Sequence, residues 1–264
     1  MLKTEASLAD QLRGWRQLRR MSQMDLSLEA GISTRHLSFI ESGRSRPSRE
    51  MVLRLAERLD VPLRSRNALL LAAGFAPAYA ERTLDDPALA PAKRAIDSIL
   101  KGHEPFPALA VDRHWTLVAS NDAVPPLLTG VADALLLPPV NVLRLSLHPQ
   151  GLAPRIINSA EWRSHLLQRL EEQCIASGDA KLAALRDELL TYPAPAAAGD
   201  RRDFAGLIVP LILDVGGQEL SFLSTTTIFG TPTEVTLSEL AIESFFPADD
   251  KTAAALGKHR QPHP

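Results

Sequence analysis

Apolar residues recur at helical spacing in short runs through the first 75 residues of the chain. The first run contains Leu8, Leu12, Trp15 and Leu18, and similar runs cover residues 22–30, 33–42, 48–59 and 63–74. Serine before a run and glycine after it supply helix caps and stops, at Ser22, Gly31, Ser33 and Gly43. The pattern predicts a compact all-helical domain of five helices over residues 1–75.

The helix predicted at residues 33–42 has an unusual exposed face. At about 100° per residue, Leu37 and Ile40 define its buried side. The opposite side carries four residues, with Thr34 near the helix N-terminus: Arg35, Ser38, Phe39 and Ser42. An ordinary solvated helix is one explanation. The short capped helix and glycine turn before it favour another, a helix-turn-helix whose second helix enters the major groove of DNA.

Residues 76–104 have the composition of a connector. Proline and acidic residues flank one predicted helix at about residues 87–101, and Gly102 ends it. This helix could be a stiff spacer, or it could be a dimerisation helix.

The periodicity changes after the connector. Residues 108–121 alternate across a tight turn and predict a β-hairpin, and residues 206–247 predict three strands, the first two joined at Gly216 and Gly217. Helices are expected between these blocks, at residues 159–178 and 179–190. The whole chain is therefore predicted to be α+β, with a PAS-like domain of five antiparallel strands and helices over 105–248 and a flexible tail at 249–264. PAS-like folds keep small-molecule pockets between sheet and helices.

Composition and charge support two domains with different partners. The chain has 264 residues, of which 45% are hydrophobic, and this length exceeds that of a typical single domain. Residues 1–80 carry 13 Lys and Arg against 8 Asp and Glu, whereas residues 81–264 carry 16 against 23. A basic first domain joined to an acidic remainder suggests that only the first part meets a polyanion.

The sequence offers no support for catalysis. Cys174 is the only cysteine, which excludes an intrachain disulfide and a multi-cysteine zinc site and fits a reducing compartment. G-x-S-x-G, a glycine-rich phosphate loop and metal-spaced histidines are missing, so we expect no enzyme, cofactor or metal. Because no secretory h-region and no apolar run of membrane-spanning length occurs, we expect a cytoplasmic protein without a membrane partner.

Residues 22–63, SQMDLSLEAGISTRHLSFIESGRSRPSREMVLRLAERLDVPL, resemble the Xre-type helix-turn-helix of the Cro and phage-repressor class, and the resemblance spans about residues 8–74. It implies that Gln23 contacts the DNA backbone or an outer base, and that Thr34, Arg35 and Phe39 contact bases. Because many relatives have a polar residue at Phe39, an apolar contact to a thymine methyl is the expected substitute there.

Other residues complete the predicted DNA-binding set. Ser33 and Ser38 belong to the same surface, and Arg44 and Arg46 lie in a loop from which they can reach phosphates. Arg16 and Glu41 match positions that pair in relatives, and for them we favour a structural role. Arg16 and Glu41 are the last residues that the resemblance identifies in the first domain.

Most of residues 76–250 resemble the MmyB-like ligand-binding domain. The resemblance rests on HEPFPALAVDRHWTLVASNDA, NVLRLSLHPQGLAPRIINSAEWRSHLLQRL and TLSELAIESFFPAD. It implies a PAS-like domain that binds a small apolar molecule, with fatty acids a plausible class. Candidate ligand contacts in these segments are Trp115, Asn121, His148 and Trp162, while Arg144 and Arg155 could pair with a carboxylate head group or with surface acids.

Together these features predict a one-component transcription regulator that acts as a homodimer on double-stranded operator DNA. A small apolar, fatty-acid-like effector in the C-terminal domain would modulate binding. Two alternatives stay open at this point. The C-terminal domain could be a ligand-free dimerisation or protein-interaction module, or the helix-turn-helix could serve a partner protein, as in an antitoxin or adaptor.

Overall fold

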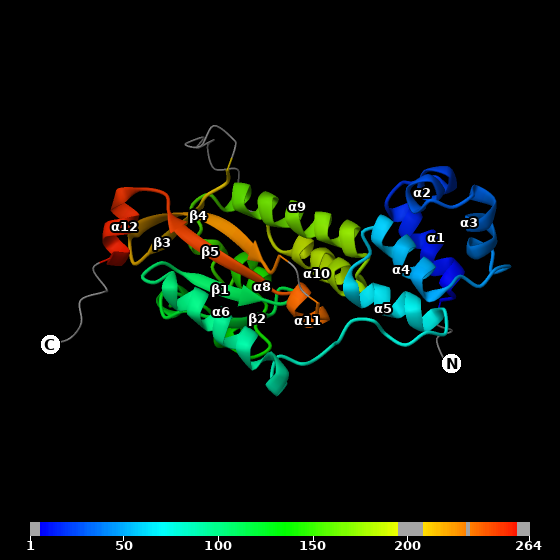
Figure 1. Ribbon diagram of the computed structural model, residues 1–264. Helices are drawn as coiled ribbons and strands as arrows, with labels where there is room; N and C mark the ends of the chain where they lie inside the picture. The colour runs from blue at the N-terminus through cyan, green and yellow to red at the C-terminus, as the bar shows by residue number, and fades with distance from the viewer. Residues whose placement is uncertain (1–5, 195–207, 231–232, 258–264) are drawn as a thin grey trace. The chain divides into compact units, whose positions relative to one another are not determined.

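Five helices lie at the N-terminus of the computed structural model (Figure 1). A serine side chain caps the first turn of four of them. Each serine oxygen accepts a hydrogen bond from the backbone N–H three residues on, which satisfies a donor that the first turn leaves unpaired. The helices are α1 (Leu8–Leu18), α2 (Gln23–Ala30), α3 (Thr34–Glu41), α4 (Arg49–Arg58) and α5 (Leu63–Ala72). The prediction of a five-helix N-terminal region is confirmed.

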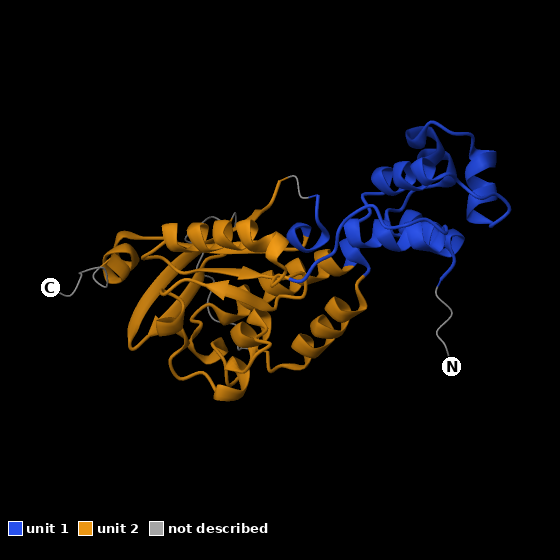
Figure 2. Cartoon of the chain, turned by 60° about the horizontal axis from the view of Figure 1, so that its bottom comes forward, with its two compact units in different colours: residues 1–83, 175–178, 231–238 blue, residues 84–174, 179–230, 239–264 orange. Residues whose placement is uncertain are grey.

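The structure describes residues 6–194, 208–230 and 233–257. The chain divides into two units, and Figure 2 colours the first unit blue and the second orange. The first unit consists of residues 1–83, 175–178 and 231–238, and the second contains the rest of the chain. Two short segments from late in the sequence therefore join the helical unit, which the sequence did not predict.

The core of the first unit forms where the apolar faces of its helices meet. Residues from all five helices are almost completely buried: Leu12, Leu26, Leu37, Ile40, Val52, Leu55, Leu69 and Leu70. Burying one such side chain contributes about 1.5 to 3 kcal/mol. Leu37 and Ile40 of α3 belong to this shared core, so their burial holds α3 against the other helices of the unit.

Residues 233–238 belong to the first unit and contact both α5 and the segment that follows it. Ala80 and Glu234 form a parallel β-bridge, and α11 (Val235–Ser238) contacts α5. The buried Glu234 carboxylate accepts hydrogen bonds from the backbone N–H groups of Arg82 and Leu237, at 2.9 and 2.8 Å. The segment after α5 is thus held by a later part of the chain.

A five-stranded antiparallel sheet organises the second unit. Its strands are β1 (Ala108–Val111), β2 (Leu117–Ser120), β3 (Leu211–Val215), β4 (Gln218–Ile228) and β5 (Ala241–Pro247), in the order β2-β1-β5-β4-β3. The register pairs Leu109 with Ser120 and then shifts at a bulge after Ala110. The predicted hairpin, the predicted turn at Gly216 and Gly217, and the five-stranded α+β fold are confirmed.

Helices pack against both faces of this sheet. On the inner face, α8 (Val142–Leu147), α9 (Ser159–Ser177) and α10 (Ala180–Thr191) share one apolar cluster with the strands. On the other side, η1 (Pro87–Leu89) leads into α6 (Ala90–Gly102), which contacts β1 (Figure 1). The inner cluster contains the large side chains of the unit, and it is here that a cavity can form.

Short elements complete the second unit. They are η2 (Pro125–Leu128), α7 (Asp133–Leu136), η3 (Ala153–Arg155) and α12 (Asp250–Gly257). The prediction of a flexible tail from residue 249 is wrong at α12, because Thr252 and Leu256 are buried there and the Thr252 hydroxyl accepts the Ser221 N–H at 3.0 Å. The remainder of the predicted tail, residues 258–264, lies outside the described residues.

Candidate functional site

The turn between α2 and α3 is built by local capping. Ser22 and Asp25 form a reciprocal capping box at the start of α2, and Gly31 ends α2 at a φ of 66°, in the left-handed region that favours glycine. Ser33 then caps α3. The Ser27 and Thr34 hydroxyls are 3.0 Å apart and link the two helices. The resulting helix–turn–helix leaves the N-terminal half of α3 exposed.

The exposed side of α3 carries the residues expected to contact bases. Thr34 and Arg35 are exposed, and Ser38 and Phe39 are half-buried. The Arg35 guanidinium carbon lies 5.4 Å from the centre of the Phe39 ring, within the range of a cation–π contact. Phe39 therefore has a second role that the sequence did not indicate, because its ring supports the arginine beside it.

Gln23 belongs to a polar network beneath α3. The Arg16 guanidinium donates to both Glu41 carboxylate oxygens, at 2.7 and 2.9 Å, and the Gln23 side-chain amide donates to the same carboxylate at 2.8 Å. Burial would raise the pKa of Glu41, but the hydrogen bonds from Arg16 and Gln23 outweigh it and lower the pKa. The predicted DNA contact of Gln23 would be made by a side chain that this network already orients.

The loop after α3 carries the remaining basic candidates. Gly43, at a φ of 70°, turns the chain away from α3, and the Arg44 N–H donates to the Phe39 carbonyl at 2.8 Å. The side chains of Arg44 and Arg46 are exposed. Ser33, by contrast, uses its hydroxyl as the N-cap of α3, where it accepts the His36 N–H. DNA contact by Ser33, Arg44 and Arg46 stays a prediction.

An apolar cavity lies between the inner face of the sheet and helices α8 and α9. Its volume of about 100 Å³ is several times what one water molecule needs. Sixteen of its twenty lining residues are apolar, and the four polar ones are Ser146, Arg169, Ser224 and Glu243. A cavity of this chemistry suits an apolar ligand with one small polar group.

Two of the predicted ligand residues line this cavity. The indole N–H groups of both already have partners, since Trp115 donates to Gln173 at 2.7 Å and Trp162 donates to Ser146 at 3.0 Å. Trp115 also has a φ of 63°, which is uncommon for a bulky residue. Because both indole N–H groups are paired, we expect a ligand to contact these two side chains through their apolar ring atoms.

The other predicted ligand residues do not line the cavity and make structural contacts. Buried Asn121 bonds to the backbone at Leu100, Phe106 and Ala108. Arg144 donates to both Glu188 oxygens, and Arg155 donates to three backbone carbonyls. The His148 ring packs edge-on against Tyr192 at 5.0 Å. Ligand binding by these four residues stays a prediction that the cavity does not support.

Two residues that the sequence did not single out supply the charged groups in the cavity wall. Arg169, from α9, donates to both carboxylate oxygens of Glu243, on β5, at 2.6 and 3.0 Å. The strand alternation could have indicated Glu243, because it shares a face of β5 with Phe245. Its partner lies 74 residues away in sequence, and no local pattern connects the two.

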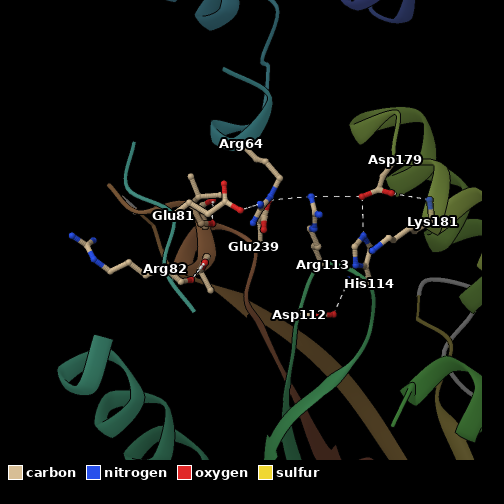
Figure 3. Close-up of polar contacts among 12 residues, drawn as sticks. Arg64, Glu81, Arg82, Asp112, Arg113, His114, Asp179, Lys181 and Glu239 are labelled. Carbon is tan, nitrogen blue, oxygen red and sulfur yellow. Dashed lines mark hydrogen bonds and ion pairs between the residues drawn. The ribbon is translucent and has the colours of Figure 1, made fainter. Parts of the chain in front are cut away.

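A separate polar cluster joins the β1–β2 turn to the start of α10 (Figure 3). His114 Nε2 lies 2.8 Å from Asp179 Oδ2, and Arg113 lies 3.7 Å from the same oxygen. Asp179 also caps α10 by accepting the Lys181 N–H. Burial raises the pKa of Asp179, but the His114 and Lys181 hydrogen bonds and the positive charges outweigh it and lower the pKa. The cluster fixes the turn that carries Trp115.

The fold and these two sites define a DNA-binding protein with a ligand-binding domain. Residues 12–65 match the helix-turn-helix family model, and residues 92–258 match the model of the MmyB-like transcription regulator ligand binding domain. No curated protein matches the chain. Because the second match covers more than half of the sequence, the chain belongs to the MmyB-like transcription regulators, with an Xre-type helix-turn-helix at its N-terminus.

Neither matched family is an enzymatic type. Within the described ranges, no group of three or more His, Cys, Asp or Glu side chains is placed to hold a metal ion. No helix in the described part of the chain combines the length and apolarity needed to cross a bilayer. The candidate sites described for this chain are the exposed side of α3 and the apolar cavity.

Proposed function

We propose that the protein is a one-component regulator whose helix-turn-helix binds a specific operator and whose C-terminal domain tunes that binding when a small apolar effector enters the cavity. The observation that supports this most is the cavity itself, whose wall is apolar at sixteen of twenty residues and includes two tryptophan rings. The lining suits an acyl chain of the fatty-acid type, although the cavity of about 100 Å³ must widen to admit a chain of medium length, since ligand pockets usually measure about 300 to 1,000 Å³. Such a regulator would act in the cytoplasm, where its operator is accessible.

The energetics of an acyl ligand are sufficient for regulation. Burying one methylene contributes about 0.8 kcal/mol before the cost of association, so a medium-length chain could bind at micromolar concentration. The effector must then bind two states of the protein with different affinity. A difference of about 1 to 3 kcal/mol changes operator affinity about 5- to 150-fold.

The DNA half of the proposal assigns separate roles to the arginines. Arg35 lies on the exposed side of α3 and would contact a base edge, whereas Arg44 and Arg46 in the following loop would contact phosphates. One recognition helix covers a single half-site. A specific operator with two-fold symmetry therefore requires two copies of α3, and we propose a homodimer on that ground.

Mass spectrometry of an organic extract of the purified full chain tests the ligand half. We expect a co-purified acyl compound, and we expect added acyl ligands to quench or shift tryptophan fluorescence, because Trp115 and Trp162 line the cavity. Operator binding measured with and without the ligand then gives the sign of the response. If no lipid is extracted and no chain length binds, the C-terminal domain is better explained as a ligand-free dimerisation or protein-interaction module.

A further inference from the structure

Glu243 occupies a position where a charged side chain is unexpected. It lies on central strand β5, on the same face as Ala241 and Phe245, and this face is turned toward the apolar cluster. Its side chain is 6% exposed, and that of Arg169 is 22% exposed. Burying two charges is strongly unfavourable unless they are paired, and apolar residues of similar volume often give equal or greater stability. Stability alone therefore does not account for this pair in the wall of an apolar cavity.

The hydrogen bonds of the pair hold the positive charge of Arg169 against Glu243. Arg169 Nη2 donates to Glu243 Oε1 at 2.6 Å and to the Thr226 hydroxyl at 2.7 Å, and Nη1 donates to Glu243 Oε2 at 3.0 Å. The Thr226 hydroxyl donates in turn to Glu243 Oε1 at 3.0 Å. The guanidinium carbon also lies 4.6 Å from the centre of the Trp115 ring. The arginine is fixed by these contacts, and its charge is compensated.

This arrangement disfavours an anionic head group. A ligand carboxylate bound beside the pair would need Arg169 as its partner, and it would have to displace Glu243 or stand beside it as a like charge. A hydroxyl or amide group meets no such repulsion. The described contacts occupy three of roughly four acceptor sites on the Glu243 carboxylate, so Oε2 can still accept a hydrogen bond from a neutral donor.

We infer that the Arg169–Glu243 pair selects an acyl-chain effector with an uncharged, hydrogen-bond-donating head group, such as a fatty alcohol or a fatty amide, over a carboxylate. The inference rests on the proposed ligand-binding function of the same cavity. Glu243 is the specificity-determining residue in this proposal, because it cancels the charge that would otherwise attract an anion. Arg169 holds Glu243 in place and presents it to the cavity.

Calorimetric titration of the full chain with 1-decanol and with decanoate at pH 8 tests the inference. Decanoate is ionised at this pH, since a carboxyl group has a pKa near 4 to 5. We expect 1-decanol to bind the natural chain about 10- to 100-fold more tightly than decanoate. In Glu243→Gln the arginine charge is no longer cancelled, and we expect the ratio of the two affinities to shift toward decanoate by about tenfold or more.

Two further variants complete the test. Glu172→Gln removes the same charge from an exposed position of α9 that does not line the cavity, and it should leave the ratio unchanged. Thr226→Val removes two hydrogen bonds to the pair but no charge, and it should change the ratio far less than Glu243→Gln. If Glu243→Gln does not fold, the ratio in the natural chain still decides whether the cavity prefers a neutral head group to a carboxylate.

Three results would contradict the inference, and they are distinguishable. Equal or tighter binding of decanoate by the natural chain overturns the head-group preference while the proposed function stands. A preference for 1-decanol that Glu243→Gln leaves unchanged overturns the role of Glu243, because desolvation of the carboxylate alone would then explain it. Binding of neither compound overturns the proposed function itself, and the inference with it.

Discussion

The two units of the protein each contain a buried Arg–Glu pair with a third polar partner, but the surroundings of the two pairs differ. Arg16 and Glu41 pair between α1 and α3, and the Gln23 amide completes the set. Arg169 and Glu243 pair between α9 and β5, with the Thr226 hydroxyl as the third partner. In both pairs the guanidinium donates to both carboxylate oxygens, which is the strongest geometry for such a contact.

The difference lies in what surrounds each carboxylate. Glu41 is 2% exposed and is the buried last residue of α3, whose outer side carries the predicted DNA contacts, so this pair orients the helices around it. Glu243 is equally enclosed by protein, but it forms part of a cavity wall. The comparison shows that two Arg–Glu pairs of the same geometry can have different surroundings. One orients the helix with the predicted DNA contacts, and the other forms part of the wall of the cavity proposed to bind a ligand.

The largest expected effect tests the supporting role of the first pair. Glu41→Ala leaves the Arg16 guanidinium, which is 12% exposed, without its carboxylate partner. Breaking a buried pair from one side destabilises a protein by about 3 to 5 kcal/mol. We expect a loss of this size in the free energy of unfolding of the first unit, measured by native-state hydrogen exchange of the α1–α3 amides in the full chain.

A matched substitution controls for loss of a surface charge. Glu57→Ala, at an exposed position of α4, should change the same exchange free energy by less than about 0.5 kcal/mol. If Glu41→Ala also costs under about 1 kcal/mol, water must screen the pair, and the contrast with a surface ion pair disappears. We expect Glu243→Gln to destabilise its own unit less than Glu41→Ala does the first, because glutamine can still accept from Arg169.

The next effect concerns the exposed surface that the first pair supports. Arg35→Ala should weaken binding to the operator by about 1 to 3 kcal/mol and weaken binding to scrambled DNA much less, because a base contact distinguishes sequences. Arg44→Ala should weaken both equally and lower the slope of log affinity against log salt by about 1. Binding isotherms on both DNAs across a salt series measure these quantities.

Arg58→Ala serves as the control for loss of a positive charge, since Arg58 is exposed on α4, away from α3 and its loop. It should change neither specificity nor the salt slope measurably. An equal loss for Arg35→Ala on operator and scrambled DNA would remove Arg35 from base recognition and would leave it as one more phosphate contact.

Much of the fold and of the DNA-binding surface could be predicted because the signals are local. Ser22, Gly31 and Ser33 lie within a few residues of the helix ends that they fix, and the spacing of Leu37 and Ile40 alone identifies the exposed side of α3. The strands were predictable for the same reason, since alternation and the Gly216–Gly217 turn lie within one hairpin. Local patterns of this kind carry over directly from sequence to structure.

The polar contacts of the second unit could not be predicted in the same way, because they join segments that lie far apart in the sequence. Nothing near Arg144 in the sequence indicates that Glu188 will pair with it, or that Asn121 will bond to the backbone of Leu100. Arg144 was therefore named as a ligand candidate although its charge is already compensated: hydrogen bonding from Arg144 lowers the pKa of Glu188. The Arg169–Glu243 pair was not predicted for the same reason, because its two residues lie 74 positions apart in the sequence.

The smallest expected effect concerns His165, which lies beside Trp162 on α9 with 5.5 Å between ring centres. Burial is the main cause that lowers the pKa of His165, and the positive charge of Arg169 lowers it further, while Glu243 and Glu172 act in the opposite direction. In the unfolded chain the group titrates near pH 6.5. As the pH falls below this value, the unfolded state takes up a proton that the folded state does not.

Stability should therefore be complete above about pH 6.5 and decline as the pH falls toward the lower, folded pKa of His165. Uptake of one proton by the unfolded chain changes the slope of the unfolding free energy against pH by at most about 1.4 kcal/mol per pH unit. We expect the urea midpoint of the natural chain to fall more steeply with decreasing pH than the urea midpoint of His165→Gln. The range from about pH 7.5 to about pH 5.5 brackets the titration of the unfolded group at about 6.5. Parallel curves would mean that His165 accepts its proton as readily in the folded state as in the unfolded chain, and that neither burial nor the charge of Arg169 lowers its pKa.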